Sequence, residues 1–399
     1  MITLKSAFHP VPADSMTARI LLAFLATAGL YYVTIMPALI DGLKEGLAFT
    51  NRQAGLVGSF NMYGGATGAL LMALIVKRVP WRPAAHGMLL ALIAIDVVSI
   101  FVLHPIALIV VRFVHGAIGG ALVGLTYSLF ARIPAPDRTF GVLLLVQAGM
   151  GGLGVMILPL LVPTFGTPVL FWALILFSAI TLLMLQFLPA YPVPPGRAKL
   201  TLRLASGNRR PLLFALLSVA LFQAANMGLY AFLIGLGRHA GLEVEFISQT
   251  LGMSNWVAML GALLVIFLST RHGIFLPIIT GILINILGTW MFIYSESQLF
   301  FVIANCLTAV TWNFGIACLL GMAARFDEHG QTAVWAGFAS KIGLASGPMV
   351  GSLILADTSY GALVWAALGM LVLGAIAASM PAWSLDRQAD VASVAGGAK

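Results

Sequence analysis

Long apolar runs separated by short polar segments dominate the chain. Each run is about 20 residues long, enough for a helix to cross the ~30 Å hydrocarbon core of a bilayer. Barrel strands are excluded because they alternate polar and apolar residues, and helices satisfy every backbone group in lipid. The pattern predicts an all-α polytopic membrane protein with twelve transmembrane helices, near 17–40, 55–76, 84–103, 106–129, 141–162, 168–188, 211–236, 248–269, 274–294, 298–322, 332–355 and 360–381.

One segment near the middle of the chain interrupts this pattern. Residues 190–210 carry five Lys/Arg, three prolines and no acid, so the segment cannot lie in hydrocarbon. We predict a basic cytoplasmic linker there. It separates an N-terminal six-helix bundle, residues 1–189, from a C-terminal six-helix bundle with a short cytoplasmic tail, residues 211–399.

The two predicted bundles repeat one another at an offset of 193–194 residues. The matching pairs are GSFN (58–61) with GMSN (252–255), Arg78 with Arg271, Arg132 with Arg325, and Gln147 with Lys341. A duplicated six-helix unit predicts two pseudo-symmetric bundles, with a binding site near the middle of the membrane between them.

Composition and charge agree with this interpretation. The chain is 60% hydrophobic and 9% charged, whereas soluble chains are about 25% charged. Sixteen Lys/Arg fall on the predicted cytoplasmic segments and three on the opposite side, so the positive-inside rule predicts that both termini are cytoplasmic. The net charge of +8 follows this topology and indicates no nucleic-acid partner. Short loops and few cysteines favour a bacterial inner membrane, and we expect a monomer.

These features together resemble the major facilitator superfamily of secondary transporters, over essentially the whole sequence. RFVHGAIGG at 112–120 is similar to the family's R-x-x-x-G-x-x-G-G. The loop after the second span keeps Arg78 of the family's G-x-x-x-D-R-x-G-R-R but has Lys77 at the position of the acid. The second copy of that loop keeps Arg271 and also lacks the acid. The resemblance implies rocking-switch transport, with gating roles for Arg78 and Arg271.

Three formal charges fall well inside the predicted hydrocarbon region: Asp96, Arg112 and Lys341. Asp96 lies eight residues before His104 and Arg112 eight after it, so both sit roughly 12 Å from the same surface and can form an ion pair. Two interpretations remain open, a static structural pair and a proton relay in which Asp96 takes a proton and releases Arg112. His115, one turn beyond Arg112, either joins that relay or is a packing residue.

Lys341 stands about nine residues into the eleventh span and has no acid within a helical turn. It either meets an anionic substrate or serves as a structural counter-ion. Oxalate/formate-type antiporters of the same superfamily are similar in using a lysine of this span for a substrate carboxylate. We predict that Lys341 and Arg112 bind the solute.

Polar and aromatic residues in mid-span positions complete the predicted amphiphilic pocket. The resemblance implies that spans 1, 4, 7 and 10 line a central cavity, which favours residues of the first, seventh and tenth spans. The predicted substrate-binding residues, besides Arg112 and Lys341, are Tyr31, Tyr32, Gln147, Gln223, Asn226, Tyr230, Asn305 and Trp312. Further mid-span polar residues are Asn61, Tyr63 and Asn255.

Signature sequences of ATPases, zinc proteases and serine hydrolases do not occur in the chain. We therefore predict no enzymatic activity, no cofactor and no metal, and transport driven by a gradient. The favoured function is secondary transport of a small organic anion such as a carboxylate, coupled to protons, with the solute, protons and the bilayer as partners. The alternatives are a proton-antiport exporter of drugs or metabolites and, outside transport, a membrane receptor or lipid-handling protein on the same scaffold.

Overall fold

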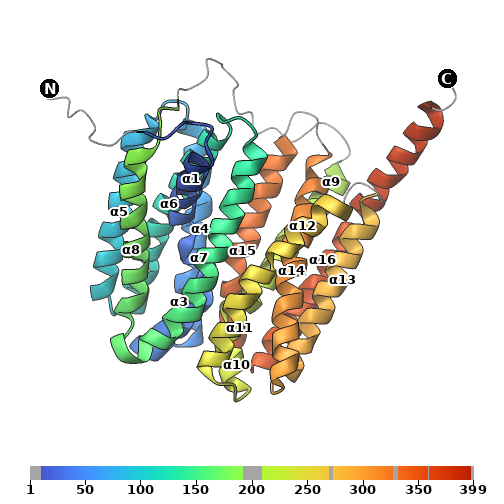
Figure 1. Cartoon of the computed structure of the whole chain (residues 1–399). Helices are drawn as coiled ribbons and strands as arrows, with labels where there is room; N and C mark the ends of the chain where they lie inside the picture. The colour runs from blue at the N-terminus through green and yellow to red at the C-terminus, as the bar shows by residue number, and fades with distance from the viewer. Residues whose placement is uncertain (1–9, 192–208, 269–272, 327–330, 358, 397–399) are drawn as a thin grey trace. The chain divides into compact units, whose positions relative to one another are not determined.

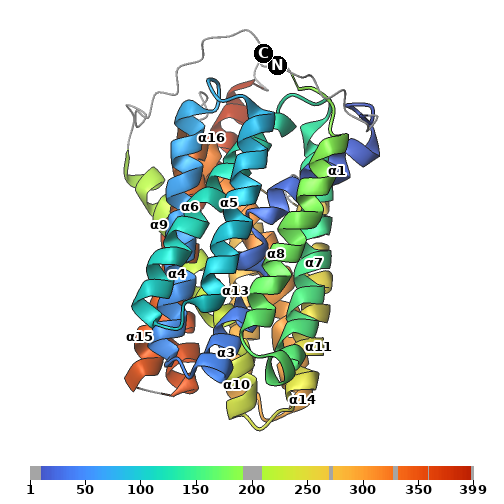
Figure 2. The same ribbon diagram turned by 90° about the vertical axis from the view of Figure 1, so that its left-hand side faces the viewer.

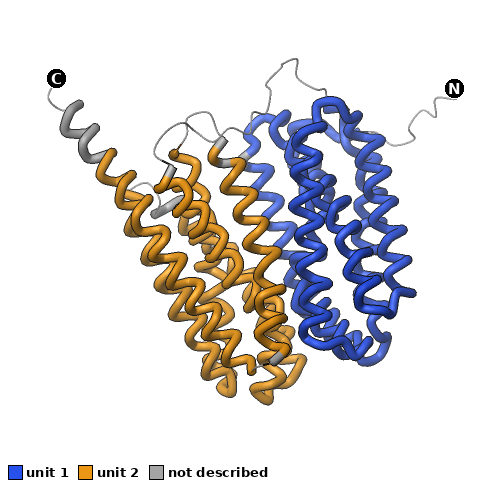
Figure 3. Tube along the Cα trace, turned by 180° about the vertical axis from the view of Figure 1, so that it is seen from behind, with its two compact units in different colours: residues 1–200 blue, residues 201–399 orange. Residues whose placement is uncertain are grey.

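The protein is built from helices (Figure 1). The computed structural model describes residues 10–191, 209–268, 273–326, 331–357 and 359–396, and these ranges contain no strand. The chain divides into two compact units, Met1–Leu200 and Thr201–Lys399 (Figure 3). The predicted all-α class is confirmed. Most of the predicted linker at 190–210 lies outside the described residues.

Unit 1 contains a helix, or a broken helix, at each of the first six predicted spans. These are α1 (Met16–Ala28), α2 (Tyr31–Thr34), α3 (Met36–Leu47), α4 (Asn51–Ile75), α5 (Trp81–Phe101), α6 (Pro105–Phe130), α7 (Pro136–Phe165), α8 (Pro168–Met184) and the short 3-10 helix η1 (Leu185–Phe187). The prediction of one continuous helix over 17–40 is wrong. Gly29 ends α1, and Pro37 in the first turn of α3 has no N–H for a helical bond to the preceding turn, so the chain breaks into three pieces.

Unit 2 follows the same order of elements. Its helices are α9 (Arg209–Ala231), α10 (Leu233–His239), α11 (Val244–Val257), α12 (Met259–Leu268), α13 (Phe275–Met291), the 3-10 helix η2 (Phe292–Tyr294), α14 (Gln298–Ala324), α15 (Gln331–Asp357) and α16 (Tyr360–Gly396). The seventh predicted span is broken at Phe232 and the eighth at Ala258. The last helix continues beyond the predicted end at residue 381, because the polar sequence that follows contains no helix-breaking residue before Gly396.

The helix pairs of unit 1 recur in unit 2. In unit 1, α1 packs on α7, α4 on α6, and α5 on both α6 and α8. Figure 2 views this unit from the side of α5 and α8. In unit 2 the corresponding pairs are α9 with α15, α12 with α14, and α13 with both α14 and α16. The internal repeat of the sequence is therefore also a repeat of helix packing.

The tightest of these contacts joins α4 to α6. A Cβ added to Gly68 would lie 1.8 Å from the carbonyl oxygen of Ala117, and one added to Gly120 would lie 1.9 Å from that of Gly65. Neither distance leaves room for a side chain, so glycine is required for this close approach, as at many membrane-helix interfaces. The α4 helix begins with a capping box, in which Thr50 and Gln53 bind one another's backbone N–H.

Nine helices of the described chain are long and apolar enough to cross a membrane. The predicted spans missing from this set are the first, second and eighth. The first and eighth are divided into shorter helices, and glycines and polar residues lower the hydropathy of α4.

Candidate functional site

Asp96 and Arg112 form an ion pair inside unit 1. Arg112 Nη1 lies 2.7 Å from Asp96 Oδ1, and both side chains are fully buried. The sequence spacing about His104 predicted this pair, because α5 and α6 form a hairpin that turns at that residue. The predicted ion pair is therefore confirmed as a contact.

The second terminal nitrogen of the Arg112 guanidinium also binds unit 1. Nη2 donates to the carbonyl oxygen of Ile95 at 3.3 Å and to the hydroxyl of Ser99. The guanidinium carbon lies 5.1 Å from the centroid of the Phe171 ring, in a cation–π contact. Arg112 has no exposed surface, so a solute cannot touch it in this arrangement.

His115 completes this buried cluster. Its Nε2 lies 3.3 Å from Asp96 Oδ1, so one carboxylate oxygen faces both the guanidinium and the imidazole. Residues 112 and 115 are three positions apart on α6 and therefore share a helix face. On the other side of the ring, His115 Nδ1 lies 2.9 Å from Nδ2 of Asn61. The ring of Tyr32 packs against the imidazole, with centroids 5.9 Å apart.

The second oxygen of Asp96, Oδ2, is buried and has no hydrogen-bond partner among the described residues. Buried polar atoms are nearly always bonded, so this oxygen is unusual, as is Arg112 Nε, the other buried atom of the cluster without a partner in the described chain. Oδ2 leaves one position on the carboxylate open to a proton.

A second polar cluster lies in unit 2, where α9, α14 and α15 meet. Trp312 Nε1 donates to Gln223 Oε1 at 2.6 Å, and Gln223 Nε2 donates to Ser340 Oγ at 2.7 Å. The ring of Tyr230 meets Trp312 edge-on, with centroids 5.9 Å apart, and its hydroxyl accepts from Asn255 at 3.3 Å. Three of the predicted substrate-binding residues, Gln223, Tyr230 and Trp312, are thus brought together.

Lys341 follows Ser340 on α15 and is half-buried. Within the described part of the chain, its ammonium has neither a hydrogen-bond nor an ion-pair partner. A cation at mid-span without a partner is costly unless a ligand or water meets it.

The remaining predicted residues lie elsewhere. Tyr31 is buried and stacks on Phe177, with centroids 4.5 Å apart. Gln147 is half-buried on α7. Asn226 and Asn305 are buried, and each donates to a carbonyl of its own helix. None of these four joins either cluster.

A third buried group, which was not predicted from the sequence, is centred on Asn285 of α13. Its Nδ2 lies 3.1 Å from Asn226 Oδ1, 2.8 Å from Thr311 Oγ1 and 3.3 Å from the carbonyl oxygen of Thr308. Asn285 is fully buried. A polar residue in the middle of an apolar span was the signal for it.

The gating roles of Arg78 and Arg271 stay predictions. Arg78 is exposed, and Arg271 lies outside the described residues. The buried Arg19 donates to the carbonyl oxygens of Pro134 and Ala135 at 2.8 and 2.9 Å. It therefore connects α1 to the segment between α6 and α7. This contact was not predicted from the sequence.

Arg132 and Tyr191 make a second contact of this kind in unit 1. Arg132 Nη1 donates to the carbonyl oxygen of Tyr191 at 3.0 Å, and the ring of Tyr191 packs on Trp81. Burial raises the pKa of Tyr191 to about 12, partly opposed by the charge of Arg19. The Tyr191 side chain therefore stays a neutral phenol throughout the physiological pH range.

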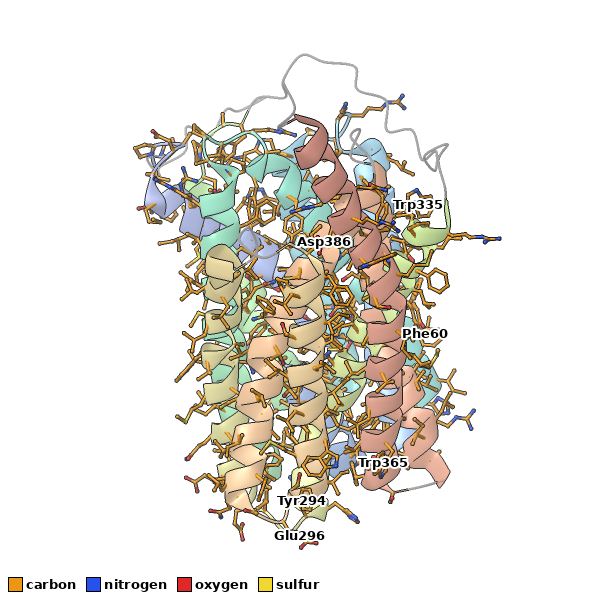
Figure 4. The ribbon with its side chains drawn as sticks, turned by 90° about the vertical axis from the view of Figure 1, so that its right-hand side faces the viewer. Phe60, Tyr294, Glu296, Trp335, Trp365 and Asp386 are labelled. Carbon is orange, nitrogen blue, oxygen red and sulfur yellow. The ribbon has the colours of Figure 1, made fainter. Side chains whose placement is uncertain are left out.

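In unit 2, an acid on α16 binds the start of α13. Asp386 Oδ1 accepts from the backbone N–H of Ile274 at 2.8 Å, and Oδ2 accepts from that of Phe275 at 2.9 Å. Figure 4 labels Asp386 on α16. This carboxylate satisfies backbone donors that the start of a helix leaves free.

Comparison with known proteins gives the family. No curated protein sequence matches the chain. Among solved structures, the chain is similar to the nucleoside transporter NupG (17% identity, TM-score 0.68, covering 93% of this chain and 98% of that one) and to a variant of it (16%, 0.70, 93% and 98%). It is also similar to a D-xylose-proton symporter (14%, 0.68, 90% and 96%). A sequence profile of the Major Facilitator Superfamily matches residues 20–326. The chain, with its repeated helix pairs and buried membrane charges, belongs to the Major Facilitator Superfamily of transporters.

Proposed function

We propose that this secondary transporter carries a small organic anion and couples its movement to a proton held by Asp96. The observation that carries the proposal is the fully buried Asp96 carboxylate, which shares Oδ1 between Arg112 and His115 and leaves Oδ2 without a partner in the described chain. The short loops and few cysteines favour a bacterial inner membrane, and the distribution of Lys and Arg favours cytoplasmic termini.

Protonation of Asp96 changes the energetics of the whole cluster. The neutral carboxyl no longer balances Arg112, and a buried charge that loses its partner costs about 3–5 kcal/mol. The unit then gains from any rearrangement that gives Arg112 water or another anion. A single proton can therefore favour one conformation over another, which is what coupling requires.

Lys341 supports an anionic solute. Asp96 balances Arg112, whereas Lys341 has no ion-pair partner among the described residues. The neighbouring Trp312–Gln223–Ser340 chain places polar groups and an aromatic ring near it. A carboxylate with an apolar body fits this chemistry.

The first experiment identifies the solute by thermal stabilisation of purified protein. A ligand at about 100 times its Kd stabilises the folded state by roughly 2.7 kcal/mol. We expect carboxylates to raise the melting temperature of the wild type and to lose this effect in Lys341→Gln. Stabilisation by carboxylates that survives in Lys341→Gln would contradict the role of Lys341.

The second experiment tests coupling in proteoliposomes loaded with a pH gradient. We expect Asp96→Asn to abolish proton-driven accumulation of the solute while exchange of labelled for unlabelled solute continues. Glu296→Gln, at an exposed acid at the end of unit 2 (Figure 4), is the matched control. Proton-driven accumulation by Asp96→Asn at the wild-type level would overturn the proposal.

A second candidate solute is a neutral polar molecule such as a nucleoside or a sugar. The Gln223, Trp312 and Ser340 hydrogen-bond chain favours it, and the similar solved structures include a nucleoside transporter and a D-xylose-proton symporter. In that case neutral solutes stabilise the protein, Gln223→Ala removes the effect, and Lys341→Gln does not. Stabilisation by varied lipophilic compounds in both variants would instead support a drug or metabolite exporter.

A further inference from the structure

We propose that Asn61 holds His115 as a neutral imidazole with its proton on Nε2, so that Asp96 alone takes up a proton in this cluster. The inference concerns a positioning residue on α4. It rests on the proposed function only for its consequence in transport, because the state of His115 can be measured without a solute or a gradient.

The hydrogen-bond partners of Asn61 determine which atom of its amide faces His115. Asn61 Nδ2 lies 3.0 Å from the carbonyl oxygen of Arg112 and 2.9 Å from His115 Nδ1. A carbonyl oxygen only accepts, so the amide must present its NH₂ group to it. That group has two hydrogens, one for the carbonyl and one for the imidazole.

The tautomer of His115 follows from this contact. Nδ1 accepts the second hydrogen of Asn61 and therefore carries no proton. A neutral imidazole then has its proton on Nε2, which lies 3.3 Å from Asp96 Oδ1. Both ring nitrogens thus have partners of the correct kind: a donor faces Nδ1 and an acceptor faces Nε2.

A charged His115 is incompatible with the same arrangement. An imidazolium donates from both nitrogens, so its Nδ1–H would face the N–H of Asn61. Turning the amide over would set its oxygen against the carbonyl oxygen of Arg112, which places two acceptors together. Protonation of His115 therefore requires Asn61 to leave its position.

Packing keeps Asn61 in that position. A Cβ added to Gly116 would lie 1.8 Å from the backbone oxygen of Asn61, and one added to Gly64 would lie 2.1 Å from that of Phe113. The α4 and α6 backbones are therefore in direct contact on either side of the amide. Asn61 is only 4% exposed, so its side chain cannot rotate out into solvent.

The other groups around His115 do not offer it a second acceptor. In the described chain, the titratable or charged groups that face it are Asp96 from α5, Arg112 from α6 and Tyr32 from α2. Asp96 receives the Nε2 proton, Arg112 is a cation, and Tyr32 presents its ring. None of them accepts a proton from Nδ1.

The entering proton then has one destination. It forms an O–H bond with Asp96 Oδ2, the oxygen that has no partner among the described residues. The carboxylate loses its negative charge, Arg112 keeps its protons and the imidazole keeps its single proton. Release reverses this step, so the cluster exchanges one proton per cycle.

Nitrogen NMR of the intact protein, with ¹⁵N-labelled histidine, measures the His115 tautomer directly. The chain has seven histidines, and His115→Gln identifies the signal by its loss. We expect the wild type to show a neutral ring with the proton on Nε2, unchanged into mildly acidic pH. In Asn61→Ala the bare Nδ1 gains a proton on acidification. Thr67→Val is the matched control on α4, because the Thr67 hydroxyl donates to a carbonyl of its own helix.

Three results would overturn the inference: a proton on Nδ1 in the wild type, a charged wild-type ring at neutral pH, or the same titration in the wild type and Asn61→Ala. If Asn61→Ala does not fold, the wild-type spectrum still decides, since the inference fixes its tautomer. Transport separates this inference from the proposed function. The expected tautomer without proton-driven uptake would overturn the proposed function alone, and proton-driven uptake with Nδ1–H would overturn the inference alone.

Discussion

At the scale of single residues, the Asp96–Arg112 pair is held by more than its own attraction. Burying two charges costs several kcal/mol for each ion. Here the bonds from Arg112 to Ser99 and to the Ile95 carbonyl, together with the Phe171 ring, offset part of that cost. The two partners are nevertheless unequal. A carboxylate becomes neutral when it gains a proton, whereas a guanidinium does not lose its proton in proteins.

This inequality gives the first prediction. Asp96→Leu leaves a permanent buried cation and should lower the free energy of unfolding by about 3–5 kcal/mol. Arg112→Met leaves an acid that can protonate, so it should cost less. The folded variant then binds a proton that the unfolded chain has released, and its stability should fall as pH rises. Thermal unfolding in detergent across pH 5–8 measures both effects. Equal losses at every pH would contradict the argument.

The sequence predicted this pair but not its surroundings. Equal spacing of Asp96 and Arg112 about a turn fixes their depth. The bonds to Ser99 and Asn61 depend on how far each helix is rotated about its axis, and this rotation is set by packing with other helices. The same reason hid Asn285, whose partners come from α9 and α14.

At the scale of elements, the start of α13 depends on a residue more than 100 positions away in the sequence. The first backbone N–H groups of a helix have no partner within it. Asp386 accepts from two N–H groups here, those of Ile274 and Phe275, and its charge also suits a helix N-terminus. The contact joins α16 to α13 within unit 2.

The second prediction tests this cap. Asp386→Ala should lower the free energy of unfolding by about 1 kcal/mol, the typical loss of an N-terminal cap. Asp386→Asn should lose less, because its amide oxygen can still accept one bond. Thermal unfolding measures the loss, and Glu296→Ala, at an exposed acid, serves as the control. A loss of stability in Asp386→Ala no greater than in the control would show that this cap does not stabilise α13.

The third prediction concerns the contact between α4 and α6. In Gly68→Ala the new methyl group would lie 1.8 Å from the Ala117 carbonyl oxygen, so the helices must separate. We expect a loss of about 1–3 kcal/mol, as for other overpacked interiors. Gly87→Ala on α5 is the matched control, because nothing lies within 4 Å of the added carbon. That control should be neutral or slightly stabilising. Equal melting temperatures for the two variants would contradict the close approach.

Element positions were largely predictable, and breaks within them were not. Hydropathy fixes where a helix crosses lipid, so every predicted span has a helix at its place. Gly29 and Pro37 did signal the breaks in the first span, but a long apolar run outweighed them. The extension of α16 was missed because hydropathy marks only the part of a helix that lies in lipid. The helix itself continues into the polar sequence beyond it.

At the scale of the whole molecule, the two units repeat the same helix pairs, but the buried polar residues of those pairs differ. The pair α5 and α6 carries Asp96, Arg112 and His115. The corresponding pair, α13 and α14, carries the neutral Asn285 and Thr311. An ancestral repeat can therefore hold a charged cluster in one unit while the other unit keeps neutral hydrogen bonds. Under the proposed function, unit 1 would handle the proton and unit 2 would supply polar contacts to the solute.

The orientation of the chain in the membrane gives the last prediction. Asp386 binds the start of α13, and Glu296 follows the end of α13 and η2 (Figure 4). The Lys/Arg distribution predicts that the end that carries Arg387 lies in the cytoplasm. In a background with Cys306 and Cys318 replaced by alanine, a cysteine at Glu296→Cys should react with a membrane-impermeant maleimide on intact cells. A cysteine at Arg387→Cys, one residue from Asp386, should react only after the cells are opened. The reverse pattern would invert the topology and place the basic segments outside, where the positive-inside rule does not allow them.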